Sequence, residues 1–193
     1  MYEALNSIYT YKGSDILINK LNIKDEILLK EYETRMVSFK LATITLSNML
    51  KSFDINHLKK IHKYLFDEVY NFAGEFRREN ITKDNFKFAE YEYIEENAKL
   101  ILNSINISNL KLLSYDELIS KISYLLTELN VLHPFRDGNG RTIRELIRQL
   151  LYEIGYEINF QNIEYNDIIR VSKLAIIDES EQIKLLKKSI TKI

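Results

Sequence analysis

Residues 133–144, HPFRDGNGRTIR, contain the side chains whose types and spacing could carry out group transfer. His133 has a ring whose usual pKa, about 6.5, suits proton transfer near neutral pH, so we expect it to act as a general base. Asp137 places a carboxylate in the same loop. Magnesium in proteins commonly binds through one or two carboxylates together with phosphate oxygens of a substrate. The segment therefore predicts a base at His133 and a Mg²⁺ ligand at Asp137.

The middle of this segment predicts a site for an anion. Gly138 and Gly140 let the backbone approach a ligand closely, and the helical flanks exclude the hairpin that Asp-Gly and Asn-Gly otherwise favour. A loop that leads into a helix N-terminus offers unpaired N–H groups and the positive end of the helix dipole to a phosphate. Arg141, Arg144 and Arg148 lie on one side of that helix, and the first two begin within its first turn, where cations oppose the dipole unless an anion is bound. A polyphosphate is the expected ligand.

Each of these residues also has an ordinary structural explanation when it is considered alone. A histidine after a helix is more often structural than catalytic, and an arginine stripe is often a solvated helix face, tied here by an Arg141–Glu145 pair. The combination within twelve positions favours chemistry. Phe135, apolar between polar neighbours, is expected to point into the core, and His57 and His62 are expected to be surface or packing residues.

Helices are expected to hold the loop, because one Pro and five Gly are too few for the many turns of an all-β protein. Ser114 and Glu117 form a capping pair ahead of an apolar stripe that runs into the loop. After the loop an apolar cluster predicts a second helix that ends at Gly155. Apolar spacing predicts further helices over residues 24–50, 56–69, 161–174 and 178–188. Residues 75–89 are the exception: aromatic residues flank a turn-like segment, which predicts a short hairpin.

Composition excludes several classes of protein. The chain has 193 residues, which fits a single domain over residues 1–193, and its formal charge of −1 disfavours direct nucleic-acid binding. It has no cysteine, so any metal should be a hard ion bound by oxygen. We find no signal peptide and no apolar run of the ~20 residues that cross a bilayer, and expect a soluble, cytoplasmic protein without a membrane partner.

The segment at residues 133–144 resembles the signature H-x-F-x-[D/E]-G-N-G-R-x-x-R of the Fic (filamentation induced by cAMP) family, with every specified position filled. Residues 61–66 and 70–77 look like the family's segment before its flap hairpin, and residues 80–89 look like the flap. Residues 9–25 are similar to the opening of small stand-alone bacterial Fic toxins, which makes residues 1–23 an N-terminal arm. The resemblance implies the Fic fold: mainly α, a helical bundle with a short β-hairpin flap beside the active-site loop.

The resemblance implies a protein adenylyltransferase that moves AMP from ATP to a Ser, Thr or Tyr hydroxyl and releases pyrophosphate. His133 would deprotonate the hydroxyl, and Asp137 would hold Mg²⁺. Arg141 would neutralise charge on the departing phosphates, and Arg144 would hold the γ-phosphate. An anion hole would be formed by three successive residues, Gly138, Asn139 and Gly140.

The resemblance also assigns a role to the hairpin, which would hold an extended segment of the target protein by strand addition. The residues expected to dock the target are Ile81, Thr82, Lys83 and Phe86. Gly140 matches the adenylyl-transferring pattern, whereas the related Doc toxins, which phosphorylate their target, carry Lys there.

Regulation by a separate protein is a further expectation. Many Fic proteins are inhibited by a helix with the pattern [S/T]-x-x-x-E-[G/N], whose glutamate pairs with the arginine that matches Arg144. No Ser or Thr in this sequence has Glu four residues later, so we expect a separate small antitoxin to supply that helix. For toxins of this type the family suggests DNA gyrase or topoisomerase IV as the target.

Three alternatives remain open. The first is a Fic-type transferase that uses another donor, such as UTP or a CDP-linked group. The second is removal of AMP from a modified protein, which uses the same groups in reverse. The third is a helical module that binds a nucleotide without turnover.

Overall fold

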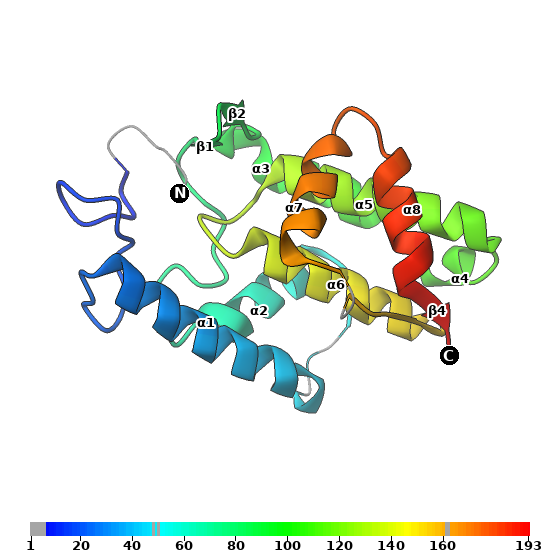
Figure 1. Ribbon diagram of the computed structural model, residues 1–193, viewed down its shortest axis with the longest axis horizontal. Coiled ribbons are helices and arrows are strands. Elements are labelled where there is room, and N and C mark those ends of the chain that lie inside the picture. The colour runs from blue at the N-terminus through cyan, green and yellow to red at the C-terminus, as the bar shows by residue number, and fades with distance from the viewer. Residues whose placement is uncertain (1–6, 48, 50, 161–162) are drawn as a thin grey trace.

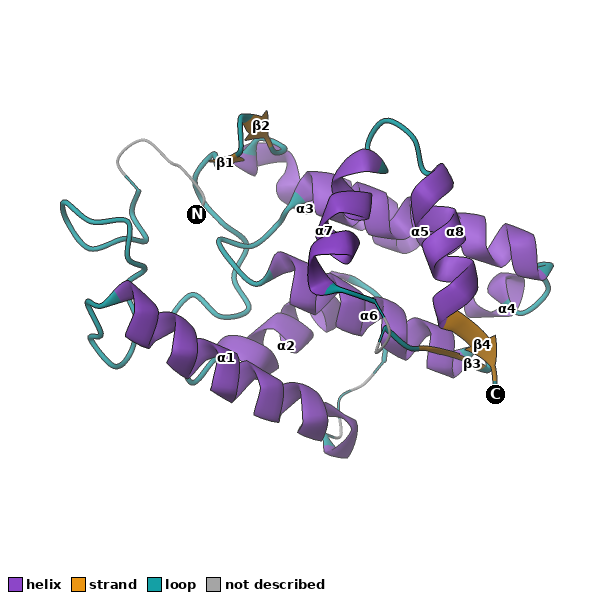
Figure 2. Cartoon of the chain, viewed as in Figure 1, coloured by secondary structure: helices purple, strands orange, loops and turns teal. Residues whose placement is uncertain are grey.

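The computed structural model describes residues 7–193 except 48, 50, 161 and 162, and its described part is mainly helical (Figure 2). The helices are α1 (Glu26–Thr43), α2 (Ile55–Phe66), α3 (Ile94–Asn103), α4 (Ile107–Leu110), α5 (Tyr115–Leu132), α6 (Asn139–Glu153), α7 (Tyr165–Leu174) and α8 (Ser180–Ser189). The strands are β1 (Thr82–Lys83), β2 (Phe86–Lys87), β3 (Tyr156–Ile158) and β4 (Ile190–Lys192). Short 3-10 helices cover Ile44–Leu46 and Tyr91–Tyr93.

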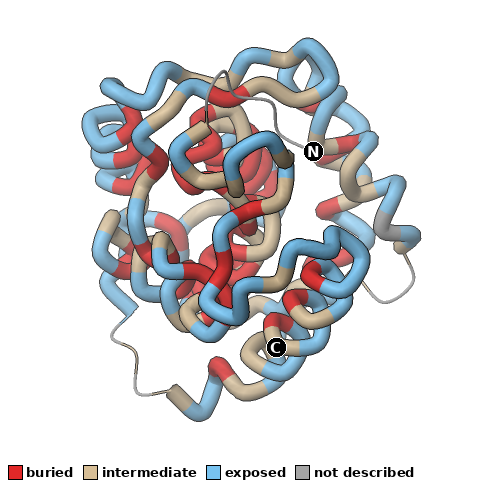
Figure 3. Tube along the Cα trace, turned by 90° about the vertical axis from the view of Figure 1, so that its left-hand side faces the viewer, coloured by how far each residue is buried: buried red, intermediate tan, exposed pale blue. Residues whose placement is uncertain are grey.

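Helix α6 lies at the centre of the packing. It contacts α2 on one side and α5 on the other, while α1 packs on α2 and both α3 and α8 pack on α5 (Figure 1). Buried residues gather inside this arrangement and exposed ones cover it (Figure 3). The predicted helical bundle is confirmed. Among the residues that the structure describes, every helix is too short or too polar to span a bilayer.

The two helices that flank the motif loop begin and end where the sequence predicts. Ser114 caps α5: its hydroxyl accepts the Glu117 N–H, and the Glu117 side chain accepts the Ser114 N–H in return. The apolar cluster of α6 is buried, and Gly155, just after the helix, has φ +86°. The outer ends of both helices, away from the motif loop, are therefore fixed by local sequence signals.

Other predicted boundaries were wrong. The helix predicted over residues 24–50 ends at Thr43, whose hydroxyl bonds the carbonyls of Phe39 and Lys40 before a 3-10 turn; residue 50 lies outside the described residues. The helix predicted over residues 56–69 ends at Phe66, because the N–H groups of both Val69 and Tyr70 turn back onto the Phe66 carbonyl.

Several elements were not predicted from the sequence. These are α3, α4 and the antiparallel pair β3–β4, which joins the segment after α6 to the end of the chain. The two predicted C-terminal helices are confirmed as α7 and α8, although residues 161–162 of the first range lie outside the described part.

The predicted hairpin is present but shorter than residues 75–89. Strands β1 and β2 pair in antiparallel register, and the turn between them places Asp84 and Asn85 at φ +52° and +63°. Tight hairpin turns require such positive φ values, which Asn and Asp adopt more readily than most residues. Residues 75–80 belong to no strand, because their polar groups bond the motif loop and the N-terminal segment instead.

The N-terminal segment reaches the foot of the hairpin. The Ser7 hydroxyl and the Ile8 N–H both donate to the Glu79 carboxylate, at 2.8 and 3.0 Å. Residues 1–6 of the predicted arm lie outside the described residues, so a single domain over residues 1–193 stays a prediction.

The capping box of α5 yields a stability prediction. Ser114→Ala should lower the free energy of unfolding by about 1 kcal/mol, because it removes the acceptor for the first-turn N–H groups. Ser120→Ala, on the same helix, should change it by less than about 0.5 kcal/mol, because this hydroxyl only bonds a carbonyl within the helix. Urea unfolding of both variants tests this, and equal losses would contradict it.

Candidate active site

His133 ends α5 in a left-handed conformation, with φ +49°. A non-glycine residue in this region costs of order 1–3 kcal/mol and persists only where its surroundings hold it. Here its N–H donates to the Leu129 carbonyl at 3.0 Å, and its own carbonyl accepts the Arg77 Nε–H at 2.8 Å. The bend turns the ring out of the helix and toward the hairpin.

The tautomer of His133 follows from its partner. Nδ1 lies 3.0 Å from the Asn130 carbonyl, and a carbonyl can only accept, so Nδ1 carries the proton. Nε2 is therefore the unprotonated nitrogen of the neutral ring. This is the form that a general base requires.

The hairpin covers the face of this ring. Phe88 stacks on it with 3.9 Å between ring centroids, and His133 is only 8% exposed. Burial, aided by the charges of Arg77 and Lys83 and opposed by the Asn130 hydrogen bond, lowers the pKa of His133 to about 3. The face of the ring that Phe88 covers is therefore closed to an acceptor.

The loop backbone is fixed by buried side chains. The Asn139 amide accepts the Phe135 N–H at 2.8 Å and donates back to the Phe135 carbonyl at 2.7 Å. Asn139 is thus a clamp within the loop, and it could contact a phosphate only through its backbone N–H. Phe135 is fully buried, as predicted.

His62 supports the motif loop through contacts with Phe135 and Asp137. The sequence predicted only that it is a surface or packing residue. It stacks on Phe135 at 3.9 Å, its Nδ1 accepts the Gly74 N–H, and its Nε2–H donates to the Asp137 carbonyl at 3.0 Å. Burial lowers the pKa of His62 to about 3. His57 is also fully buried, so neither ring is a surface residue.

Gly138 starts α6 with φ +76°, and a Cβ there would lie 2.3 Å from Cζ of Phe66. Only glycine fits, because both the backbone angle and the Phe66 ring exclude a side chain. The first-turn N–H groups of α6 follow directly, at the end of the helix where an anion could bind.

Arg141 is held by a carboxylate from outside the motif. Its Nη1 lies 2.6 Å from Glu33 of α1, its Nη2 lies 3.8 Å from Asp137, and its guanidinium covers the Phe66 ring at 4.7 Å. Glu33 accepts in turn from the Tyr70 hydroxyl. The guanidinium is therefore oriented before any ligand binds.

The predicted Arg141–Glu145 pair was wrong. Glu145 is buried and pairs instead with Arg148, through two contacts of 2.7 Å, and with Gln149 at 2.8 Å. Arg141 pairs with Glu33 of α1 instead.

Arg144 folds back over the start of its own helix. A Cβ on Gly140 would lie 2.9 Å from its Nη1, so the guanidinium occupies the space that a side chain at position 140 would need. Gly140 and Arg144 also line a narrow crevice between α5, α6, α7 and α8. The missing side chain at Gly140 thus brings a second cation to the helix N-terminus.

Asp137 has the chemistry of a magnesium ligand but does not by itself form a metal site. Its Oδ1 accepts the Gly138 N–H at 2.5 Å, and its side chain is partly exposed beside Arg141. Within the described residues there is no group of three or more His, Asp or Glu that could hold a metal. A hard cation here would need phosphate oxygens as further ligands.

The predicted target-docking residues are not equally accessible. Ile81 is 1% exposed and packs in the core, so its side chain cannot contact a target, whereas Thr82, Lys83 and Phe86 are partly exposed. The Ile81 carbonyl accepts the Phe88 N–H within the hairpin.

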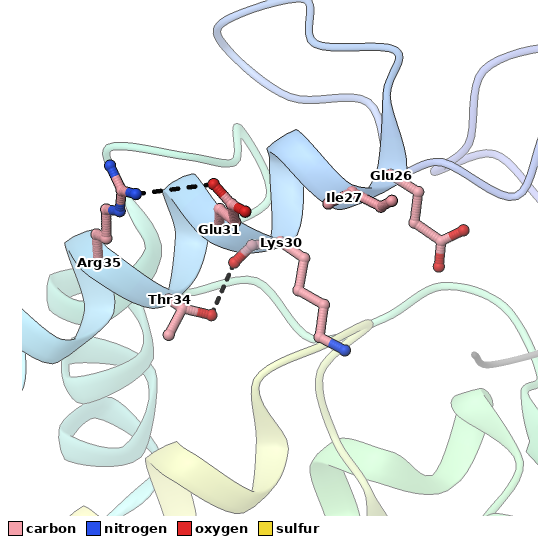
Figure 4. Close-up of a pocket in the computed structure, with 6 residues that line it drawn as sticks. All are labelled: Glu26, Ile27, Lys30, Glu31, Thr34 and Arg35. Carbon is pink, nitrogen blue, oxygen red and sulfur yellow. Dashed lines mark hydrogen bonds and ion pairs between the residues drawn. The ribbon is translucent and has the colours of Figure 1, made fainter.

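A second depression, on α1, is not part of this site. It is lined by residues of α1 alone, with Arg35 3.7 Å from Glu31 and the Thr34 hydroxyl bonded to the Lys30 carbonyl (Figure 4). Side chains from one helix do not converge on a ligand, and none of them is a predicted site residue.

Comparison with known proteins agrees with this geometry. Residues 52–151 match the Fic/DOC family. The chain belongs to this family. The Fic chain is 39% identical over 175 residues to protein adenylyltransferase VbhT of Bartonella schoenbuchensis, covering 89% of this chain and 36% of VbhT. It is 30% identical over 157 residues to the probable protein adenylyltransferase Fic of Escherichia coli, covering 81% of this chain and 78% of that protein.

Solved structures share the fold of the Fic chain. The N-terminal Fic domain of a Bartonella quintana protein with bound ADP matches with TM-score 0.85 and 26% identity, over 95% of this chain and 94% of that one. BepC of Bartonella tribocorum with bound AMPPNP has TM-score 0.85 at 24% identity, over 96% and 97% of the two chains. The predicted family and fold are confirmed.

The structure also reveals supporting residues that sequence reasoning missed: Glu33, His62, Arg77, Glu79 and Phe88. The first four are charged or polar types that usually face solvent, so their pattern gave no signal. Phe88 was noted only as a flank of the hairpin.

The two motif glycines should respond differently to a methyl group. Gly138→Ala should lower the free energy of unfolding by about 3 kcal/mol or more, because it adds backbone strain and overlap with Phe66. Gly140→Ala should leave it unchanged or raise it by roughly 0.5–1 kcal/mol, yet weaken AMPPNP binding about tenfold, because the Arg144 guanidinium must move. Urea unfolding and calorimetry measure both. Equal destabilisation by the two variants would refute this account of the glycines.

The buried histidines should not titrate near neutral pH. In ring NMR spectra, His62 and His133 should keep constant chemical shifts between about pH 8 and pH 5, well above their pKa values of about 3. The unfolded chain binds these protons near pH 6.5, so both groups cost stability as pH falls from about 6.5 toward about 3. A midpoint near pH 6.5 for either ring would contradict the packing described here.

Proposed function

We propose that this chain transfers AMP from ATP to a Ser, Thr or Tyr hydroxyl of another protein. The observation that carries the proposal is a neutral imidazole, unprotonated at Nε2, beside a helix N-terminus that bears two arginines. Relatives named protein adenylyltransferases and a structural neighbour with bound ADP support it. The chain spans about a third of the length of VbhT, so only the activity of this part is proposed.

His133 acts on the acceptor. Its Nε2 takes the hydroxyl proton while the acceptor oxygen forms a bond to the α-phosphorus of ATP. The bond from that phosphorus to the bridging oxygen of the β-phosphate breaks, and the electron pair leaves with pyrophosphate. Because Nδ1 already donates to the Asn130 carbonyl, the resulting imidazolium is stabilised on one side.

The loop and α6 act on the donor. The first-turn N–H groups of α6 bind phosphate oxygens, and Arg141 and Arg144 balance the charge that grows on pyrophosphate as it leaves. Arg141 needs no reorientation, since Glu33 and Phe66 already fix its plane. Most of the rate gain in this scheme comes from position and charge, which is what phosphorus chemistry demands of a protein.

Asp137 is the residue that would hold Mg²⁺. When bound, the ion supplies positive charge between phosphate oxygens and the protein. Asp137 itself is oriented by the Gly138 N–H and, through its backbone carbonyl, by His62.

The hairpin presents the target. We place an extended segment of the target along β1 and β2, where Thr82, Lys83 and Phe86 are partly exposed, so that its hydroxyl comes under Phe88 to His133. DNA gyrase and topoisomerase IV are the proposed targets. A cytoplasmic location and the role of a toxin belong to the same proposal.

Inhibition by a second protein completes the proposal. The sequence has no Ser or Thr with Glu four residues later, so the inhibitory glutamate is proposed to come from a separate antitoxin and to pair with Arg144. Arg144 lines the crevice between α5, α6, α7 and α8.

Mass spectrometry tests the activity. Incubation of gyrase, of topoisomerase IV or of a bacterial lysate with this chain, ATP and Mg²⁺ should add an adenylyl group to a hydroxyl side chain. His133→Ala should lower the rate by about 10²–10⁴-fold, as expected for loss of a general base. The dissociation constant of ATP for this variant should stay within about threefold of the wild-type value, because His133 is not part of the phosphate site.

The same experiment separates the alternatives. Incubation with UTP or a CDP-linked donor in place of ATP identifies another nucleotide, and loss of AMP from a modified protein identifies the reverse reaction. If the wild-type chain binds ATP but modifies nothing, or if His133→Ala keeps full activity, the transferase proposal fails and a nucleotide-binding module remains.

A further inference from the structure

Arg77 connects the motif loop to the hairpin. It is 2% exposed, and its guanidinium donates to four backbone carbonyls: His133 at 2.8 Å, Glu79 at 2.8 Å, Ala89 at 2.5 Å and Leu132 at 3.2 Å. The carbonyls of Leu132 and His133 lie at the end of α5. Those of Glu79 and Ala89 lie at the two ends of residues 79–89, the hairpin segment. One side chain thus fixes three parts of the chain relative to one another.

The backbone of Arg77 makes the same connection. Its N–H donates to the Pro134 carbonyl at 2.9 Å, one residue beyond His133. On the other side, the Ala89 N–H donates to the Val131 carbonyl in the last turn of α5. The end of α5 is therefore held between the two ends of the hairpin segment.

This is an unusual place for a guanidinium. A buried charge is costly unless hydrogen bonds satisfy it. Here the four hydrogen-bond acceptors around the guanidinium are neutral backbone carbonyls. Burial lowers the pKa of Arg77 to about 10, so it still carries its charge at neutral pH. The negative end of the α5 dipole and the nearby Glu79 favour that charge.

The bonds of Arg77 bear directly on the base. The left-handed conformation of His133 needs support, and Arg77 holds the carbonyl of that residue. Arg77 also holds Ala89, the neighbour of Phe88, whose ring covers the imidazole. Both the direction of the ring and the height of the hairpin above it depend on this guanidinium.

Its contacts stop short of the phosphate site. None of its hydrogen bonds reaches residues 137–144, where the nucleotide is proposed to bind. The supports of that site come from other residues: Glu33 for Arg141, His62 for the Asp137 carbonyl, and Phe66 beneath the guanidinium of Arg141.

We propose that Arg77 is a positioning residue that sets the target-binding hairpin in register with His133, and that it serves acceptor transfer without serving nucleotide binding. This inference rests on the proposed function for the role of the hairpin. A residue that only stabilised the fold as a whole would lower AMPPNP binding and adenylyl transfer together, or change neither.

Arg77→Lys separates these possibilities, because lysine keeps the charge but cannot reach four carbonyls in a plane. The acceptor is first identified by mass spectrometry with the wild-type chain and ATP. The Arg77→Lys variant should transfer adenylyl groups to that acceptor about 10²-fold or more slowly than the wild type. The dissociation constant of AMPPNP, measured by calorimetry, should stay within about threefold. The matched control is Arg148→Lys, whose guanidinium makes two bonds to Glu145 on α6, and it should change neither quantity.

A second readout needs no activity. In Arg77→Lys the hairpin loses its anchor, water reaches the imidazole, and the pKa of His133 should rise from about 3 toward 6.5 in NMR titrations. The pKa of His62 should stay unchanged in the same titrations, since the contacts of His62 do not involve Arg77. The pKa readout and the proposed function can fail independently. If the His133 pKa rises in Arg77→Lys but the wild type transfers no adenylyl groups, only the proposed function is contradicted.

The inference is overturned if Arg77→Lys transfers adenylyl groups at the wild-type rate, if AMPPNP binding is lost in parallel with transfer, or if His133 still does not titrate. Circular dichroism and the unfolding midpoint establish that each variant folds. Arg77→Gln, which fills much of the same volume without the charge, takes its place if the lysine variant does not fold, with the same expected results.

Discussion

The structure depends on the burial of polar backbone groups where α5 passes into α6. A loop in the middle of a helical bundle must find partners for its N–H and C=O groups away from water. Those partners are side chains from other segments: Arg77 takes the carbonyls at the end of α5, His62 takes that of Asp137, and Asn139 pairs with both polar groups of Phe135. The positions of the base, the carboxylate and the helix N-terminus all follow from these bonds.

Charge is arranged to receive an anion without depending on one. Two arginines at the start of α6 oppose its dipole, yet Arg141 is stabilised by Glu33 and Asp137, and by the face of Phe66. The Tyr70 hydroxyl holds Glu33 in turn, and burial together with that carboxylate raises the pKa of Tyr70, so it remains a donor. Groups that are already oriented lose little entropy when a polyphosphate binds, which is the basis of electrostatic preorganisation.

The sequence predicted what depends on local pattern. The capping pair at Ser114, the apolar face of α6 and the positive φ at Gly155 all follow from residue type and spacing, and the structure has them. It did not predict the partners of polar groups over long distances. Glu33 looked like one more charged residue on a helix, and the near neighbour Glu145 was assigned to Arg141 although Arg148 holds it. Such pairings depend on how helices pack, which periodicity does not encode.

The low pKa of His133 carries a further consequence for the order of events. Burial beneath Phe88 and the charges of Arg77 and Lys83 keep the ring neutral at any physiological pH, but a ring with a pKa of about 3 is a weak base. A polyanion at the N-terminus of α6 acts in the opposite sense, because negative charge nearby raises the pKa of an imidazole. Under the proposed function, a nucleotide bound there would therefore raise the pKa of the His133 ring. Activation of the acceptor would then be favoured when the nucleotide binds first.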